Sequence, residues 1–173
     1  MPADDRLVGD PAQAGSGAEG TLIVGYGNAL RGDDSLGWHA VERLADVPRL
    51  RDARVVWRHQ LAPELADDLS KVSLAILIDV SAEVEAGALS VRRLEPPPAA
   101  GSAWSHHIEP ASLAALAREL YGAAPVVFVV SVGAASLEVG DRLSPAVEAA
   151  LPAVVAAVVA IVAEHGSPGG SAG

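Results

Sequence analysis

The chain has 173 residues, of which 50% are hydrophobic and 3% aromatic, with a net charge of -10 and no cysteine. This length suffices for one domain with a buried core. The acidic balance disfavours nucleic acid or an anionic membrane as partner, because a polyanion would meet a repulsive field. Without cysteine, disulfides, thiolate nucleophiles and cysteine-ligated metal sites are excluded. Any chemistry must therefore use carboxylates, histidines and hydroxyls.

The two ends of the chain differ in composition from its middle. Residues 1–20 are rich in Gly, Ala, Pro and Asp and lack periodicity, and 166–173 are more extreme, with mostly Gly and Ser, so both are predicted to be disordered tails. A single α/β domain is expected over 21–165. The longest apolar run contains Pro152 and is predicted to be a buried amphipathic helix, with no membrane span. No export signal is recognisable, so a cytoplasmic location is expected.

Short apolar runs alternate with longer amphipathic ones along the chain. The strands are expected at 21–25, 53–58, 74–79, 88–94 and 125–131, and the helices at 34–46, 62–70, 110–121 and 144–164. Continuous apolar strands indicate a sheet covered on both faces, and the alternation indicates mostly parallel pairing. The predicted fold class is α/β with three layers: a five-stranded, mostly parallel, twisted sheet flanked by helices.

Two local patterns refine this expectation. The segment 88–94 alternates and follows the preceding strand without a helix, so it is predicted to be an edge or antiparallel strand. Ser144 and Pro145 have the residue types of an N-cap and a first helical position. The Pro-rich loop 95–105 is the longest irregular interior segment, and loops of that length tend to be functional.

In open α/β sheets, ligands bind beyond the carboxyl ends of the strands. The residues expected there are Gly25, Gly27, Asn28, Asp33, Asp34, His59, Gln60, Asp79, His106, His107, Ser131, Gly133 and Ser136. His59 carries little weight because no acid lies near it in sequence. Asp79, His106 and His107 can also be explained without a function. An Asp at the end of a strand can accept hydrogen bonds from loop amides, and adjacent histidines are often exposed to solvent.

The stretch "VGYGNALRGDDSLG" partly matches a dinucleotide fingerprint. Leu30 stands in place of the third glycine, and two carboxylates follow where a pyrophosphate needs a positive helix end, so nucleotide binding is disfavoured. Asp33 or Asp34 could instead cap the following helix. A cap needs one acid, however, and two adjacent acids repel each other unless a cation or proton is held nearby.

Two carboxylates and an imidazole at one sheet edge would form a ligand set for a divalent transition metal. The rival interpretation is an acid pair that shares a proton, with a histidine orienting it. No H-E-x-x-H, G-x-S-x-G or P-loop motif is present. Standard hydrolase and phosphoryl-transfer motifs therefore do not decide between these interpretations.

Four segments resemble a known family: "GYGNALRGDDSLGWHAVERL", "ILIDV", "SHHIEPASLAALARELYG" and "SLEVGDRLSPAVEAALPAVV". They are similar, in this order, to the hydrogenase maturation endopeptidases, which trim the C-terminus of the nickel-iron hydrogenase large subunit. The resemblance runs from about Thr21 to Glu164. It implies a five-stranded twisted sheet flanked by helices, of phosphorylase/hydrolase-like type, and an endopeptidase classified as aspartic-type.

The resemblance also implies a site. Asp34 and Asp79 would be the catalytic and metal-contacting carboxylates, and the third metal ligand would be a histidine before the third helix. His106 is favoured over His107, because His106 puts Ile108 and Leu113 at apolar positions of the family pattern. The supporting residues would be Gly25, Gly27, Asn28 and Asp33.

The partner implied by the resemblance is the large-subunit precursor, which would bring nickel already bound. Cleavage of its C-terminal extension would then test whether the metal has been loaded. The alternative, from a different functional class, is a non-catalytic nickel-binding or chaperone-like module that uses the same ligands.

Overall fold

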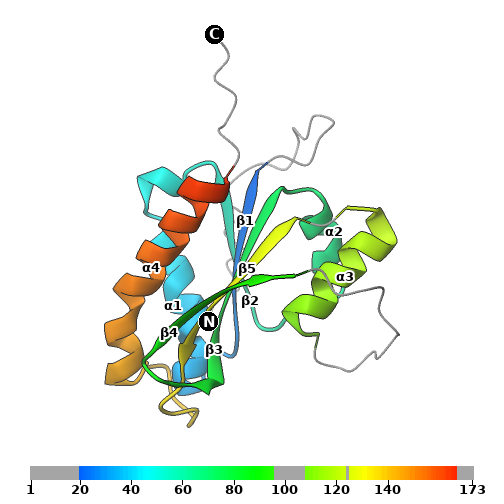
Figure 1. Cartoon of the computed structure of the whole chain (residues 1–173). Helices are drawn as coiled ribbons and strands as arrows, with labels where there is room; N and C mark the ends of the chain where they lie inside the picture. The colour runs from blue at the N-terminus through cyan, green and yellow to red at the C-terminus, as the bar shows by residue number, and fades with distance from the viewer. Residues whose placement is uncertain (1–19, 96–107, 124, 167–173) are drawn as a thin grey trace.

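The structure is a computed structural model that describes residues 20–95, 108–123 and 125–166. The strands are β1 (Thr21–Tyr26), β2 (Ala53–Arg58), β3 (Leu74–Ala86), β4 (Leu89–Leu94) and β5 (Val126–Gly133). The helices are α1 (Leu36–Leu44), α2 (Leu65–Ser70), α3 (Pro110–Tyr121) and α4 (Pro145–His165), with 3₁₀ turns η1 (Gly32–Ser35) and η2 (Pro48–Leu50). Figure 1 shows these elements as one α/β unit.

The strands form one sheet in the order β2-β1-β3-β5-β4. The first four pair in parallel, whereas β4 runs antiparallel to β5 at the edge, which confirms both expectations for this segment. β3 is longer than predicted and continues beyond Asp79 to Ala86. Its second half alternates polar and apolar residues, and the prediction, which rested on continuous apolar runs, therefore ended the strand at Asp79.

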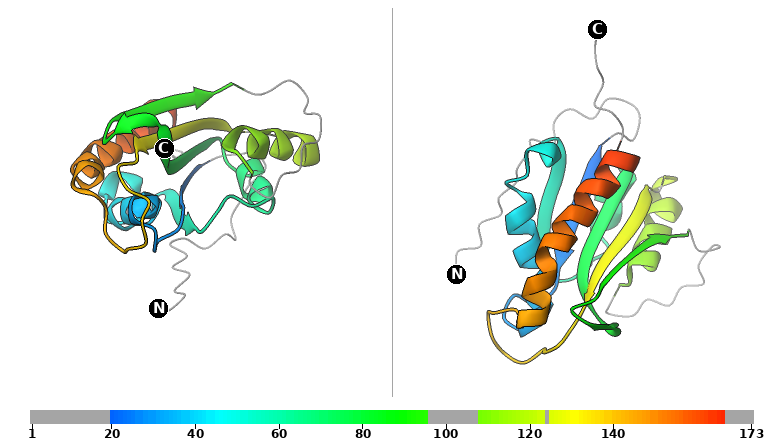
Figure 2. Two further views of the ribbon diagram at one scale, coloured as in Figure 1. Left: turned by 90° about the horizontal axis from the view of Figure 1, so that it is seen from below. Right: turned by 60° about the vertical axis from the view of Figure 1, so that its left-hand side comes forward.

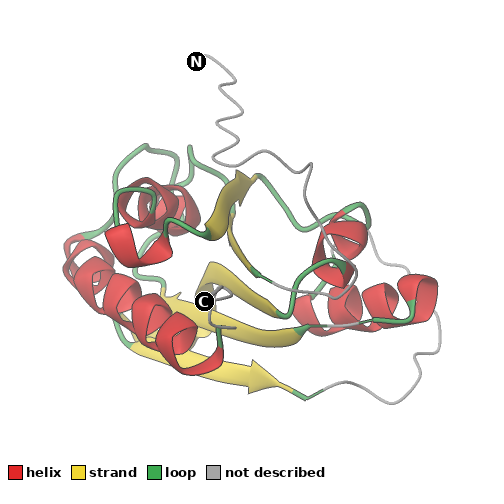
Figure 3. Cartoon of the chain, turned by 90° about the horizontal axis from the view of Figure 1, so that it is seen from above, coloured by secondary structure: helices red, strands yellow, loops and turns green. Residues whose placement is uncertain are grey.

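Helices cover both faces of the sheet, so the predicted three layers are confirmed (Figure 3). Alternate residues of β3 point to opposite faces. Leu74, Ile76 and Ile78 are buried in one core cluster with α1 and α4, and Ala75 and Leu77 are buried in the other with α2 and α3.

Two predicted helices begin later than expected. The acids at the start of the first helix lie in η1, and α1 itself begins at Leu36. The second begins at Leu65 rather than at 62. A residue before proline avoids the helical conformation, and Ala62 precedes Pro63.

The last helix, α4, begins as predicted. Ser144 is its N-cap and accepts a hydrogen bond from the Val147 amide at 3.4 Å, and a proline occupies the first turn. Pro152 lies inside the helix without ending it. By length and composition α4 could also cross a membrane, although Val154 and Val158 on one of its faces are buried in the core.

Three predictions fall outside the described residues. These are the two disordered tails, the functional role of the 95–105 loop beyond its first residue, and the positions of His106 and His107. They stay predictions.

A close contact between two glycines sets α1 against the end of β1. A Cβ atom on Gly25 would collide with the Gly37 carbonyl oxygen and lie 2.8 Å from a methyl group of Val41. The missing side chains therefore let α1 approach the strand, which places η1 beside the sheet edge.

Replacing Gly25 by Ala should lower the free energy of unfolding by about 3 kcal/mol, because α1 must move away from β1 to admit the methyl group. Urea unfolding at neutral pH measures this change. Gly140→Ala is the matched control, since a Cβ there has open space within 4 Å. Equal stability of both variants would contradict the role assigned to the contact.

Candidate functional site

A row of polar side chains crosses the sheet at the carboxyl ends of the parallel strands. Asp79 pairs with Ser131, which pairs with Ser90 across the antiparallel edge, and Tyr26 pairs with Arg58 on the other side. The Tyr26 hydroxyl joins the two halves by bonding Asp79. In the two preceding rows on this face the residues of β1, β3 and β5 are apolar, and the charged Arg54 and Arg92 lie only on the outer strands β2 and β4. The polar row therefore marks where the core ends and a site begins.

Asp79 is held by two hydroxyl groups. Tyr26 donates to its Oδ2 at 2.6 Å and Ser131 donates to its Oδ1 at 2.7 Å. Burial raises the pKa of Asp79 despite these hydrogen bonds and the charge of Arg92, and the nearby Asp34 charge acts in the same direction as burial. The hydrogen-bond partners of Asp79 are therefore hydroxyl groups, not the loop amides expected for a purely structural strand-end Asp. Asp79 and Asp34 also lie within electrostatic range of each other.

Tyr26 is a permanent donor in this arrangement. Burial raises the pKa of its phenol well above the ordinary range, and the Asp79 charge and hydrogen bond raise it further. The phenol therefore keeps its proton and orients one carboxylate oxygen of Asp79.

Asp33 is fully buried. Its Oδ2 accepts hydrogen bonds from the amides of Ala135 and Ser136, both at 2.8 Å, and its Oδ1 accepts one from the amide of Ser144 at 2.6 Å. The Ser144 hydroxyl also donates to Oδ2, at 3.0 Å. Burial acts to raise the pKa of Asp33, but these donors outweigh it and lower the pKa. No side-chain cap bond is present at η1 or α1, so the capping interpretation is wrong.

Asp34 differs from its neighbour because it is only half-buried and faces a cavity. Its Oδ2 accepts a hydrogen bond from the Asn28 amide at 2.9 Å. Gly27, with a φ of 134°, lies beneath it, and a Cβ there would come within 2.9 Å of Asp34 Oδ1. A glycine at this position therefore lets the carboxylate sit over the strand end.

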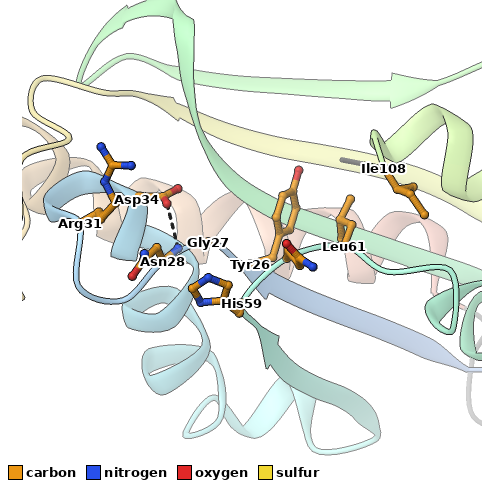
Figure 4. Close-up of a pocket in the computed structure, with 9 residues that line it drawn as sticks. Tyr26, Gly27, Asn28, Arg31, Asp34, His59, Leu61 and Ile108 are labelled. Atoms are coloured by element: carbon orange, nitrogen blue, oxygen red, sulfur yellow. Dashed lines mark hydrogen bonds between the residues drawn. The ribbon is translucent and has the colours of Figure 1, made fainter. Parts of the chain in front are cut away.

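The cavity has a volume of about 370 Å³ and opens at the sheet edge between the loops after β1 and β2 and Ile108, two residues before α3. Its lining residues are Tyr26, Gly27, Asn28, Arg31, Asp34, His59, Gln60, Leu61 and Ile108 (Figure 4). Asp79 is not among them, but Tyr26 lies between it and the cavity. The structure thus brings Asp34 and Asp79 to one region, with Asp34 in the wall and Asp79 behind Tyr26.

His59 lines the cavity, although the sequence offers little reason to expect a functional role for it. Its ring packs edge-to-face on Trp57 with centroids 6.4 Å apart, and Trp57 packs in the same way on Trp38 at 5.3 Å. His59 follows the end of a strand, where ligands bind in such sheets, but it was given little weight because no acid lies near it in sequence. Its acid neighbour in the cavity, Asp34, comes from another loop.

Among the described residues, no group of three His, Asp or Glu side chains is placed to hold a metal ion. The predicted third ligands, His106 and His107, lie outside the described residues, and Ile108 directly after them lines the cavity. Carboxylate oxygens suit a divalent cation, so Asp34 and Asp79 fit the chemistry of such a ligand set. Metal contact therefore stays a prediction.

Solved structures resemble this fold closely, whereas no protein-family model and no curated protein sequence matches the chain. The hydrogenase maturating endopeptidase HybD of E. coli has a TM-score of 0.70 and 26% identity, over 84% of this chain and 93% of its own. In fold, and at 26% sequence identity, the chain resembles the hydrogenase maturation endopeptidases.

Two further solved structures of maturation proteases share this fold. The hydrogenase 2 maturation peptidase from Thaumarchaeota archaeon SCGC_AB-539-E09 has a TM-score of 0.61 and 26% identity, over 84% of this chain and 99% of its own. The [NiFe] hydrogenase maturation protease HycI from Thermococcus kodakarensis shares the fold, with a TM-score of 0.64 and 22% identity over 86% and 95%. The resemblance inferred from sequence motifs is confirmed, and the chain spans nearly the full length of these maturation proteases.

Asp33→Asn should destabilise the protein by about 3 kcal/mol at pH 7. The Asn side chain carries no charge to strengthen the hydrogen bonds, and its NH₂ group would face backbone N–H groups that are also donors. The lowered pKa of Asp33 contributes stability above its unfolded value of about 3.9 and loses it as the pH falls through the folded value. The difference from wild type should therefore shrink in acid. Urea unfolding across this pH range measures it, with the exposed Asp46→Asn as control.

Tyr26→Phe should raise the pKa of Asp79 further, because it removes a hydrogen bond that favours the carboxylate while burial remains. Carboxyl NMR titration of Asp79 measures the change directly. Tyr121→Phe, at the exposed end of α3, is the matched control. An unchanged or lower pKa of Asp79 would show that the phenol does not stabilise its charge.

Proposed function

We propose that this protein is a hydrogenase maturation endopeptidase that removes a C-terminal peptide from the nickel-loaded large subunit of a nickel-iron hydrogenase. The main support is that Asp34 in the cavity wall lies within electrostatic range of the Tyr26–Asp79–Ser131 group, at the sheet edge of a fold shared with a hydrogenase maturating endopeptidase. The proposed location is the cytoplasm, and nucleic acid and membrane are not expected as partners.

The two carboxylates are suited to different tasks in peptide hydrolysis, which needs a base for water and an acid for the leaving nitrogen. Asp34 Oδ2 is occupied by the Asn28 amide, and the side chain borders the cavity, where a water or a cation can approach. Asp79 is half-buried, and desolvation raises its pKa, so it holds a proton more readily than an exposed carboxyl. This contrast supports the aspartic-type assignment.

Nickel enters the proposal as part of the substrate. Asp34 and Asp79 would contact the ion, and His106 would supply a nitrogen donor, with His107 as the alternative. A precursor without nickel would leave the carboxylates without a cation to hold the extension in place. Cleavage would then report on metal loading, and the free protease needs no resident metal.

The rival function, a non-catalytic nickel-binding module, uses the same residues but predicts a different product. It requires nickel to bind the isolated protein while the precursor keeps its length. None of the contacts described above favours this function over proteolysis.

Asp34→Asn, Asp79→Asn and His106→Gln should each slow processing of the nickel-loaded precursor by at least about a hundredfold, because each removes a group that acts on the scissile bond or the ion. Mass spectrometry of the precursor, with and without nickel, measures the product. His39→Gln is the control, since His39 lies in α1 and faces Glu42 at 3.9 Å.

Two outcomes would contradict the proposal in different ways. If His107→Gln blocks processing and His106→Gln does not, the nitrogen ligand is wrong by one residue. If wild-type protein binds nickel and never shortens the precursor, the rival function stands.

A further inference from the structure

Three large apolar side chains are exposed on two neighbouring loops beside the cavity. Leu30 is 55% exposed in the loop after β1, and Leu137 and Val139, in the loop after β5, are 41% and 90% exposed. We call these three residues the rim patch. Apolar side chains grouped on adjacent loops, without cover from the described residues, are typical of surfaces that bind another molecule.

The two loops are held together by backbone hydrogen bonds. The Gly140 amide donates to the Leu30 carbonyl and the Gly32 amide donates to the Gly140 carbonyl, both at 2.9 Å. The Asp33 amide bonds the Ser136 carbonyl at 2.9 Å, and its carboxylate bonds the same loop. Figure 2 shows the loop after β5 beside the turn that precedes α1. The rim patch is therefore preorganised, which limits the entropy lost on binding.

The rim patch is continuous with the cavity. Leu30 lies between Asn28 and Arg31, both of which line the cavity. The Leu30 amide donates a hydrogen bond to Asn28 Oδ1 at 2.9 Å. A molecule bound at this side of the cavity lies next to Leu30, and the backbone bonds to Gly140 join Leu30 to the loop that carries Leu137 and Val139.

We propose that the rim patch docks the protein substrate, by burying an apolar surface of the large-subunit precursor next to its C-terminal extension. This inference rests on the proposed function and adds a surface that selects the partner. A cavity of about 370 Å³ holds only a short stretch of peptide, so recognition of one protein requires contacts outside it. A few apolar residues at the centre of an interface can supply much of the binding energy.

The test compares steady-state kinetics on the nickel-loaded precursor. Val139→Ser and the double variant Leu137→Ser, Val139→Ser should raise KM, about tenfold for the double variant, while kcat stays within about twofold, because the catalytic groups are untouched. Leu120→Ser is the matched control: Leu120 is 61% exposed near the far end of α3 and should leave KM unchanged. Urea midpoints equal to wild type confirm that the variants fold.

The possible results separate the two hypotheses. A wild-type KM in the double variant overturns the docking role while the proposed function stands. A wild-type protein that leaves the precursor uncut overturns the proposed function, and this inference with it. A wild-type dimer that becomes monomeric in the double variant, with unchanged KM, assigns the patch to a second copy of the chain instead.

Discussion

The buried carboxylate of Asp33 is the interaction on which the site depends. A buried charge is costly unless hydrogen bonds satisfy it, and here three backbone amides and a hydroxyl do so. Its partners include Ser144, the N-cap of α4, so one side chain joins the turn after β1, the loop after β5 and the start of a core helix. This connection holds Asp34 in the cavity wall and fixes the loops that carry the rim patch.

The register of the sheet supplies the second constraint. Parallel strands end at the same edge, so Tyr26 and Asp79 become neighbours although they are 53 residues apart, and Ser131 completes the group from β5. Asp79 is consequently oriented by two hydroxyl groups, whereas Asp34 faces the cavity. Asp34 and Asp79 thus occupy different environments, as the separate roles of a general acid and a general base require.

The sequence predicted the features that depend on neighbouring residues. The five strands and four helices follow from local apolar periodicity, the antiparallel edge strand β4 from its alternation, and the start of α4 from Ser144 and Pro145. The later start of α2 and the extension of β3 were missed. His59 was undervalued because its acid neighbour in the cavity comes from a different loop, a relation that sequence distance does not show.

The sequence by itself determined that carboxylates follow the first and third strands at the binding edge of an α/β sheet. Only the tertiary structure decided which of the adjacent acids, Asp33 or Asp34, faces the cavity. Successive residues of a 3₁₀ turn point about 120° apart, so the two side chains take different directions, and Asp33 is the one that is buried. The inward direction is favoured for Asp33, because the amides that stabilise its charge are contributed by residues 102 to 111 positions further along the chain.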